Sequence, residues 1–194
     1  MSYVELATAG QRAFAATGAQ ELGLVVPWTP LWTTRDVLSH LVDNAERAIS
    51  GVTGPPSADE ANEAVEALQD ASVAQLVQRW RDVTHAVPSA PAGPSPEWDV
   101  AVHLADVFEV WGRPALGAAL WAPTLISALT FLERAGRLQC TVVGESGSFG
   151  DGAELAAVSD YELFRALFGR RHDVIDSVVA RGDPAVLRSL AFFG

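Results

Sequence analysis

The chain has 194 residues, of which 49% are hydrophobic, and its 13 basic and 24 acidic side chains give a formal net charge of −11. This composition predicts a folded globular protein, and the acidic charge argues against nucleic acid and anionic membranes as partners. Because Cys140 is the single cysteine, an internal disulfide and a cysteine metal cluster are both excluded.

The sequence shows no signal for membrane insertion or export. No window of 18 residues is apolar and free of charge, so we expect no segment to span a bilayer. Glu5 stands where a signal peptide would be basic. We therefore expect a cytoplasmic protein. All basic residues are arginine, which excludes lysine chemistry such as a Schiff base.

Helix-capping motifs predict that the first two-thirds of the chain is helical. Ser2-x-x-Glu5 is a capping box that opens an apolar-periodic stretch through about Glu21. The segment 23–32 contains two prolines and is interpreted as a loop. Further helices are expected from Thr33 or Thr34 to Ile49, from Ser57, from Ser72 to about Val87, over 97–111 and within 114–135, with a proline-rich linker at 88–96.

The pattern changes after residue 136. The β-branched segment 138–143 is typical of a strand, and 154–158 could pair with it after a glycine-rich turn. A helix capped by Ser159, a strand or short helix around 174–179 and a helix after Pro184 follow. We predict a mainly α protein, with a helical bundle over 1–136 and a small α+β domain over 137–194.

Two helices carry candidate metal ligands. Asp99, His103 and Asp106 are spaced i, i+4, i+7 on one helix face, and His40 lies on the apolar stripe of another helix. Spacing alone favours an ordinary ion pair between Asp99 and His103, with His40 a hydrogen-bonded core residue. The alternative is that all three bind one metal ion, leaving open positions as in catalytic zinc sites. Nickel, manganese and iron would suit the same nitrogen and oxygen ligands.

Three segments, in this order, resemble one family: VPWTPLWTTRDVLSHL at 26–41, DVAVHLAD at 99–106, and ELFRALFGRR with VVARGDPAVLRSL between 162 and 190. The family is the mycothiol-dependent maleylpyruvate isomerases, within the DinB-like metal-binding proteins. The resemblance implies a DinB-like four-helix bundle followed by a small α+β domain. It also implies a divalent metal, zinc first, and mycothiol as thiol cosubstrate.

The resemblance assigns roles to individual residues. It makes His40, Asp99 and His103 the expected metal ligands, although the family usually has glutamate where this chain has Asp99. It implies that an arginine of the C-terminal domain assists the reaction, and we select Arg170 over its neighbour Arg171. Either arginine could instead only cap the end of its helix.

Other residues near the expected site have two interpretations each. Asp106 could orient a histidine ligand, or it could face solvent. Trp32 and Trp98 could wall a pocket for the cofactor, or they could only contribute to packing. We interpret Arg35 and Asp36 as a structural ion pair at the start of a helix.

These observations predict a metal-dependent, mycothiol-using enzyme that acts by cis-trans isomerisation through reversible thiol addition, or by transfer of the thiol to a small electrophile. The expected substrate is a small carboxylate or activated alkene, and the protein is expected to be a monomer or homodimer. One alternative is a non-catalytic module that binds a small molecule or a partner. A weaker alternative is a metal-assisted hydrolase with Asp106 as base.

Overall fold

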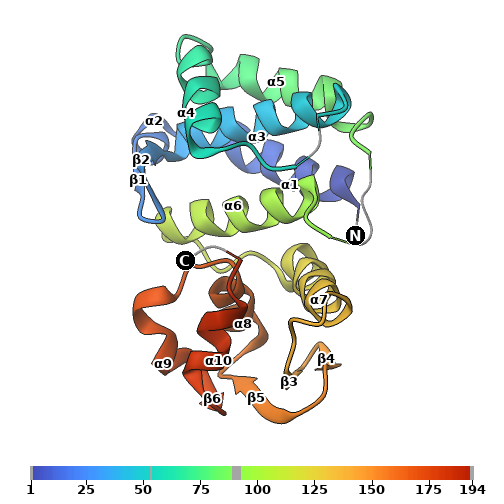
Figure 1. Ribbon diagram of the computed structural model, residues 1–194. Coiled ribbons are helices and arrows are strands. Elements are labelled where there is room, and N and C mark those ends of the chain that lie inside the picture. The colour runs from blue at the N-terminus through green and yellow to red at the C-terminus, as the bar shows by residue number, and fades with distance from the viewer. Residues whose placement is uncertain (1, 53, 89–92, 193–194) are drawn as a thin grey trace. The chain divides into compact units, whose positions relative to one another are not determined.

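The computed structural model describes residues 2–52, 54–88 and 93–192 (Figure 1). Helices account for 59% of the described residues and strands for 12%, which confirms the prediction of a mainly α protein. None of the helices in these described ranges is both long enough and apolar enough to cross a membrane. The linker expected at 88–96 falls partly on residues 89–92, which lie outside the described residues.

The chain divides into two compact units. The first comprises the described residues of Met1–Ala90 and Pro94–Leu116, and the second those of Pro91–Gly93 and Gly117–Gly194. The change of pattern after residue 136 predicts a first domain that extends to that residue. In the structure, the helix α7 (Ala118–Arg134) packs instead on α8 (Asp160–Leu167) and belongs to the second unit.

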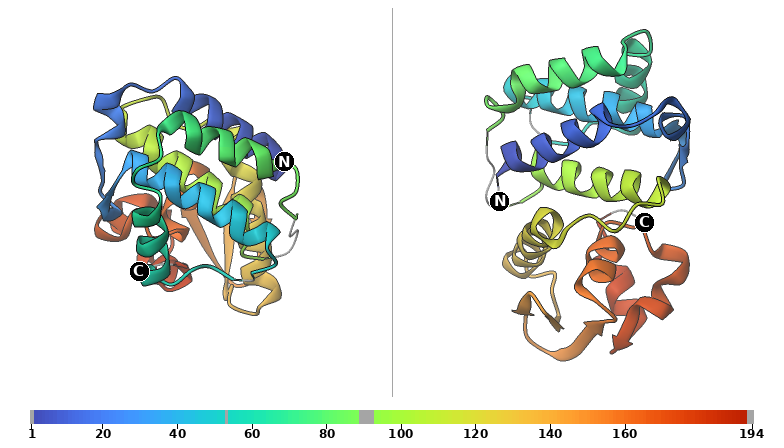
Figure 2. Two further views of the ribbon diagram at one scale, coloured as in Figure 1. Left: turned by 90° about the horizontal axis from the view of Figure 1, so that it is seen from above. Right: turned by 180° about the vertical axis from the view of Figure 1, so that it is seen from behind.

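The first unit is built from helices and one small hairpin. Helices α1, α3, α5 and α6 are the long ones: α1 contacts α5 and α6, and α3 contacts the same two helices from another side. Two views in Figure 2 show these four helices lying alongside one another. The elements are α1 (Tyr3–Ala15), α2 (Ala19–Leu22), β1 (Val25–Val26), β2 (Thr29–Thr33), α3 (Thr34–Ile49), α4 (Ala58–Ala67), α5 (Val73–Thr84) and α6 (Pro96–Val110).

Local capping explains where these helices begin. Ser2, Thr33, Ser57 and Ser72 each accept a hydrogen bond from the backbone of the residue three positions later, whose side chain bonds back to the cap. Each such box satisfies two backbone N–H groups that the helix itself leaves without a partner. The helix starts predicted from these motifs are confirmed.

The core of the first unit lies between the long helices. Phe14, Leu41, Trp80 and Leu104 are buried at 1% exposure or less. At Gly10 a Cβ atom would stand only 2.8 Å from the Trp80 ring, so glycine allows α1 and α5 to approach closely. Burial of this apolar surface is the main stabilising contribution, and it fixes the faces that α3 and α6 turn inward.

The segment predicted as a loop contains a short antiparallel hairpin. Val25 pairs with Thr33 and Val26 with Thr29, with an irregular register between the two pairs. The β-branched residues favour this extended backbone, and the prolines are tolerated because a two-stranded ribbon has only edge strands. The hairpin leads directly into α3 and places Trp32 just before that helix.

The second unit combines helices with a four-stranded sheet of order β4-β3-β5-β6. Strands β3 and β5 run parallel, and the other two pairings are antiparallel. Cys140 is buried at the start of β3. The remaining elements are β3 (Cys140–Gly144), β4 (Gly147–Phe149), β5 (Ala153–Ala157), the 3-10 helix η1 (His172–Val174), α9 (Ile175–Val178), β6 (Val179–Arg181) and α10 (Pro184–Leu190).

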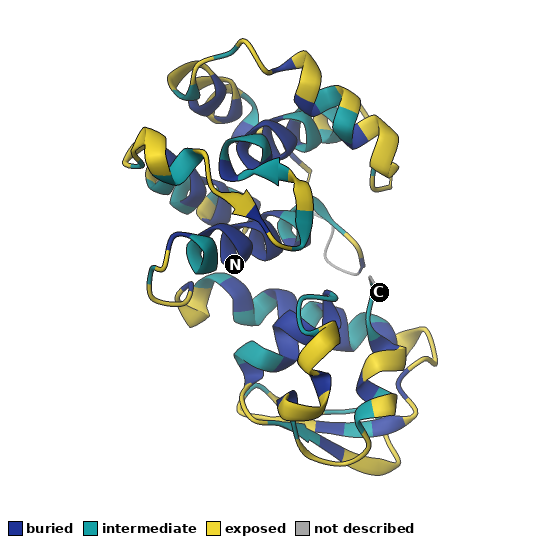
Figure 3. Ribbon diagram, turned by 90° about the vertical axis from the view of Figure 1, so that its left-hand side faces the viewer, coloured by how far each residue is buried: buried dark blue, intermediate teal, exposed yellow. Residues whose placement is uncertain are grey.

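Aromatic side chains hold α7 to α8. The Trp121 ring stacks on Phe164 at 5.7 Å between centroids and meets Tyr161 edge-on at 5.4 Å. Figure 3 shows that buried and exposed residues alternate along the helices of each unit, as expected for amphipathic elements. The small α+β region predicted after residue 136 is present, with α7 added to it.

Candidate metal centre

Two packed helices bring the candidate ligands together. His40 comes from the middle of α3, and Asp99 and His103 come from successive turns of α6. The two helices are in contact, so residues separated by about 60 positions in sequence become neighbours. One ligand atom from each of the three side chains lies within 4.8 Å of the other two.

The distances suit a single metal ion. His40 Nε2 lies 3.4 Å from Asp99 Oδ2, and His103 Nε2 lies 3.5 Å from Asp99 Oδ1. Two ligand atoms bound to one zinc ion at tetrahedral angles stand roughly 3.4 Å apart. The imidazole rings meet edge to face, with centroids 5.0 Å apart. This buried His–Asp–His group could therefore hold a metal ion.

The electrostatics of Asp99 also suit a ligand role. Burial raises the pKa of its carboxyl group, but the neighbouring His40 and His103 and a hydrogen bond from Asn44 outweigh that effect, so the pKa lies well below its usual range. Asp99 is therefore ionised at neutral pH, as a carboxylate ligand must be. The two histidines are 5% and 6% exposed, so their rings are shielded from water.

Asp106 lies behind His103. Its side chain is fully buried, and Oδ2 lies 3.2 Å from His103 Nδ1. The distance lies within the range of a hydrogen bond, but His103 Nδ1 makes no hydrogen bond within the described part of the chain. The contact is therefore chiefly electrostatic. The interpretation of Asp106 as a solvent-facing residue is wrong, because the inward face of α6 carries both Asp106 and His103.

The two tryptophans have different environments. Trp32 lies against both histidine rings, with its centroid 4.8 Å from His40 and 6.3 Å from His103. Its indole Nε1 donates to Asn62 Oδ1 at 2.8 Å, which fixes the ring. Trp98 is 5% exposed and is part of the core. The structure thus places the Trp32 ring against both histidine rings.

Asn44 is a further residue of the site, which no sequence motif indicated. This residue follows His40 by one helical turn, and its amide nitrogen donates to Asp99 Oδ2 at 2.7 Å. The same nitrogen lies 3.0 Å from His40 Nε2. The i+4 spacing from His40 could have indicated a shared helix face. The contact with Asp99 depends on how α3 packs against α6, and the spacing of His40 and Asn44 gives no information about that packing.

Several candidate residues serve local structure. Arg35 Nη1 lies 3.7 Å from Asp36 Oδ1, as expected of a structural pair, and Arg35 Nη2 also donates to three backbone carbonyl oxygens beyond α4. In the second unit, Arg170 Nη1 donates to the carbonyl oxygen of Phe168 at 2.7 Å. Arg171 makes two hydrogen bonds to Glu162. The Arg170 bond lies at the end of α8, as a capping role requires, whereas Arg171 pairs with the first turn of that helix. A catalytic role for Arg170 stays a prediction.

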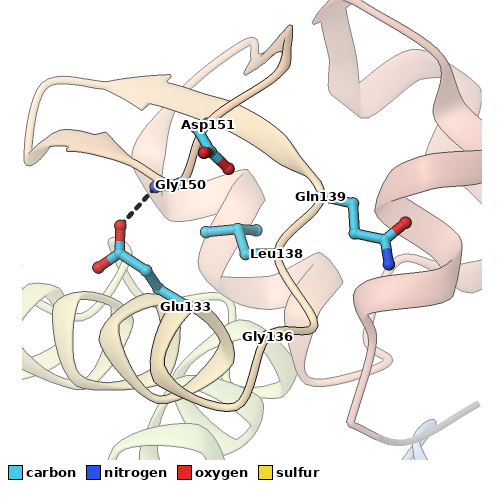
Figure 4. A pocket seen from close by; sticks show the side chains of 6 residues that line it. All are labelled: Glu133, Gly136, Leu138, Gln139, Gly150 and Asp151. Atoms are coloured by element: carbon cyan, nitrogen blue, oxygen red, sulfur yellow. Dashed lines mark hydrogen bonds between the residues drawn. The ribbon is translucent and has the colours of Figure 1, made fainter.

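A surface hollow of about 530 Å³ is found in the second unit. Figure 4 shows Glu133 at this hollow, where its carboxylate accepts a hydrogen bond from the Gly150 backbone. The lining contains neither histidine nor cysteine, so its donor set is less suited to a transition metal than the group in the first unit. The lining residues are Glu133, Gly136, Leu138, Gln139, Gly150 and Asp151.

Comparisons of the chain with protein-family models, with curated proteins and with solved structures found no match. The resemblance to the maleylpyruvate isomerases therefore stays a prediction from the three sequence segments. What the structure adds is the convergence of His40, Asp99 and His103, taken from two of those segments, on one position.

Proposed function

We propose that this protein is a metal-dependent enzyme of the maleylpyruvate isomerase type that uses mycothiol as its thiol cosubstrate. The observation that carries the proposal is the convergence of His40, Asp99 and His103 between α3 and α6. A DinB-like arrangement of the first unit and a cytoplasmic location are parts of the same proposal.

The donor set favours a catalytic rather than a purely structural ion. Three protein ligands without a thiolate leave at least one coordination position for a cosubstrate. Zinc is the first choice, and nickel, manganese and iron are compatible with two imidazoles and one carboxylate. When bound, such an ion lowers the pKa of a coordinated thiol and so favours the nucleophilic thiolate.

The surrounding residues would prepare the ligands. Asp106 would keep the His103 ring in place through its Nδ1 side, as carboxylates commonly do behind metal-bound histidines. The Trp32 ring would cover one side of both imidazoles and limit the access of water.

The proposed reaction uses the thiolate as a nucleophile toward a small carboxylate or activated alkene. Addition of the thiolate sulfur to one carbon of a cis double bond moves the electron pair of that bond onto the conjugated carbonyl group and leaves a C–C single bond, which can rotate. Return of the electron pair re-forms the double bond as the trans isomer and releases the thiolate. If the enolate instead takes a proton from solvent, the product is a thioether, and the enzyme is an S-transferase. Both outcomes need the same ligands.

The alternative of a metal-free binding module makes a structural prediction. In such a module Asp99 would be ion-paired and His40 would point away from His103. Asp99 does lie within 3.5 Å of both histidines, but the His40 ring meets the His103 ring edge to face, with centroids 5.0 Å apart, and does not point away from it. This convergence favours one metal ion bound by all three side chains. Hydrolysis with Asp106 as base is less well supported, because that carboxylate is buried behind His103.

The first test is elemental analysis of protein purified without chelators and without nickel affinity resin. We expect about one divalent ion per chain, lost in the His103→Ala variant and retained in His85→Ala, which removes an exposed histidine at the end of α5. Metal-loaded protein should then bind mycothiol. It should either consume mycothiol in a transfer reaction or isomerise a cis alkene when mycothiol is present. Absence of metal even after addition of zinc or nickel would leave the binding module as the better function.

A further inference from the structure

The side chain of Asn44 lies between two of the proposed metal ligands. Its Nδ2 atom is 2.7 Å from Asp99 Oδ2 and 3.0 Å from His40 Nε2. Asn44 is half-buried on α3, whereas Asp99 is on α6. The amide therefore joins the two helices by a hydrogen bond at the position where the ligand atoms meet.

Hydrogen-bond chemistry fixes the orientation of this amide. An ionised carboxylate only accepts hydrogen bonds, so the Asn44 atom beside Asp99 must be the NH₂ group. That group has two hydrogens, and the second can point to His40 Nε2, which then acts as the acceptor. The lone pair used at His40 Nε2 is the one that a metal ion would take.

The two carboxylate oxygens of Asp99 have different partners. Oδ2 accepts the hydrogen bond from Asn44 and faces His40, whereas Oδ1 lies 3.5 Å from His103 Nε2. An ion bound by both histidines could take Oδ1 while Asn44 retained Oδ2. His40 Nε2 would exchange its contact with Asn44 for the ion.

We propose that Asn44 is a positioning residue that holds Asp99 Oδ2 and thereby presents Oδ1 alone to the metal ion. This inference rests on the proposed metal site and adds a residue to it. The cross-helix bond from α3 fixes the Asp99 carboxylate toward the histidines. It also keeps Asp99 monodentate, which leaves a coordination position for a cosubstrate.

The test compares Asn44→Leu with the wild-type protein and with a matched control, Gln78→Leu. Gln78 also donates a hydrogen bond from its side-chain amide to an aspartate. Its partner is Asp82, four residues later on the exposed face of α5. Zinc affinity is measured by competition with a chromogenic chelator. The visible spectrum of the Co²⁺-loaded protein reports the number and geometry of the ligands. Asn44→Ala serves as a second variant, and circular dichroism checks that each variant is folded.

We expect the zinc dissociation constant to rise by about 10- to 100-fold in Asn44→Leu, the usual effect of removing a group that orients a metal ligand. In Gln78→Leu it should stay within about twofold of wild type. The cobalt absorption should weaken in Asn44→Leu, because a freed carboxylate can bind through both oxygens and raise the coordination number.

Two outcomes overturn the inference in distinguishable ways. If both Asn44 variants fold, bind zinc as tightly as wild type and give its cobalt spectrum, Asn44 does not position Asp99, and the proposed function stands. If the wild-type protein itself binds neither zinc nor cobalt, the proposed metal function fails together with this inference.

Discussion

Asp106 Oδ2 lies 3.2 Å from His103 Nδ1, and the Asp106 side chain is fully buried beneath that histidine. An ionised group is expensive to bury unless a partner offsets the lost hydration. Here one partner is the His103 ring, whose other nitrogen faces Asp99. The three residues therefore form a chain of contacts along α6, from the buried carboxylate to the proposed metal position.

Asp106→Ala should lower metal affinity by about tenfold or more, because the His103 ring loses the group that orients it. Asp106→Asn should have a smaller effect, since the amide keeps the size and one acceptor oxygen. Chelator competition measures both variants. Asp70→Ala, which removes an exposed aspartate, is the control and should bind metal as wild type does. Wild-type affinity in a folded Asp106→Ala protein would show that His103 needs no such support.

Arg35 stabilises the connection between α4 and α5. Its Nη2 atom donates to the carbonyl oxygens of Leu68, Gln69 and Ala71 at 2.6 to 2.9 Å. We expect Arg35→Ala to lower the free energy of unfolding by about 1–3 kcal/mol, because a charged donor and its acceptors lose these bonds. Urea denaturation measures the change. The exposed Arg81→Ala serves as the control, with an expected change within about 0.5 kcal/mol.

How far the sequence predicts the structure depends on how local each interaction is. The caps Ser2, Thr33, Ser57 and Ser72 bond to residues three positions away, so each helix start could be predicted. The assignment of α7 could not be predicted, because apolar periodicity shows that a helix has a buried face without showing which element covers it. That face packs on Phe164 and Tyr161, which lie some 40 residues later.

The candidate site shows the same division. The spacing of Asp99, His103 and Asp106 on one helix predicted a shared face, and the structure places all three there. His40 was predicted to complete the site from another helix, first from its place on an apolar stripe and then from the family resemblance, and its packing against α6 places it beside Asp99. Asn44 was missed because its partner Asp99 lies 55 residues away, on another helix.

Gly144 allows a buried carboxylate to hold the turn between β3 and β4. Asp160 accepts hydrogen bonds from the backbone N–H groups of Glu145 and Ser146, at 3.0 and 2.6 Å. A Cβ atom at position 144 would stand 2.0 Å from Asp160 Oδ1, which is an impossible contact. We expect Gly144→Ala to destabilise the protein by about 1–3 kcal/mol through displacement of Asp160.

Thermal or urea unfolding tests this expectation, with Gly23→Ala as the matched substitution. At Gly23 the nearest atoms to a new Cβ lie at 3.7 Å, and φ is −86°. That variant should change stability by at most about 1 kcal/mol. Equal stability of the two variants would mean that Asp160 can leave the turn without cost.

Glu60 couples the stability of α4 to pH. Its carboxylate accepts a hydrogen bond from the backbone N–H of Ser57 at 2.7 Å, and this bond, with that from the Ser57 side chain, lowers the pKa of Glu60 below its ordinary value of 4.5. Below pH 4.5 the unfolded state therefore binds the proton more readily than the folded state. The stabilisation from this carboxylate is complete above that pH and is lost as the pH falls through the lower folded pKa.

The Glu60→Gln variant isolates this effect. Glutamine can accept the same hydrogen bond without titrating, as Gln75 does from the Ser72 backbone at the start of α5. We expect the loss of stability between pH 7 and pH 4 to be smaller in Glu60→Gln than in wild type, as measured by urea denaturation at the two pH values. An NMR titration of the Glu60 side-chain carboxyl carbon provides the direct measurement. A pKa at or above 4.5 there would contradict the assignment, because the hydrogen bonds from Ser57 favour the ionised carboxylate.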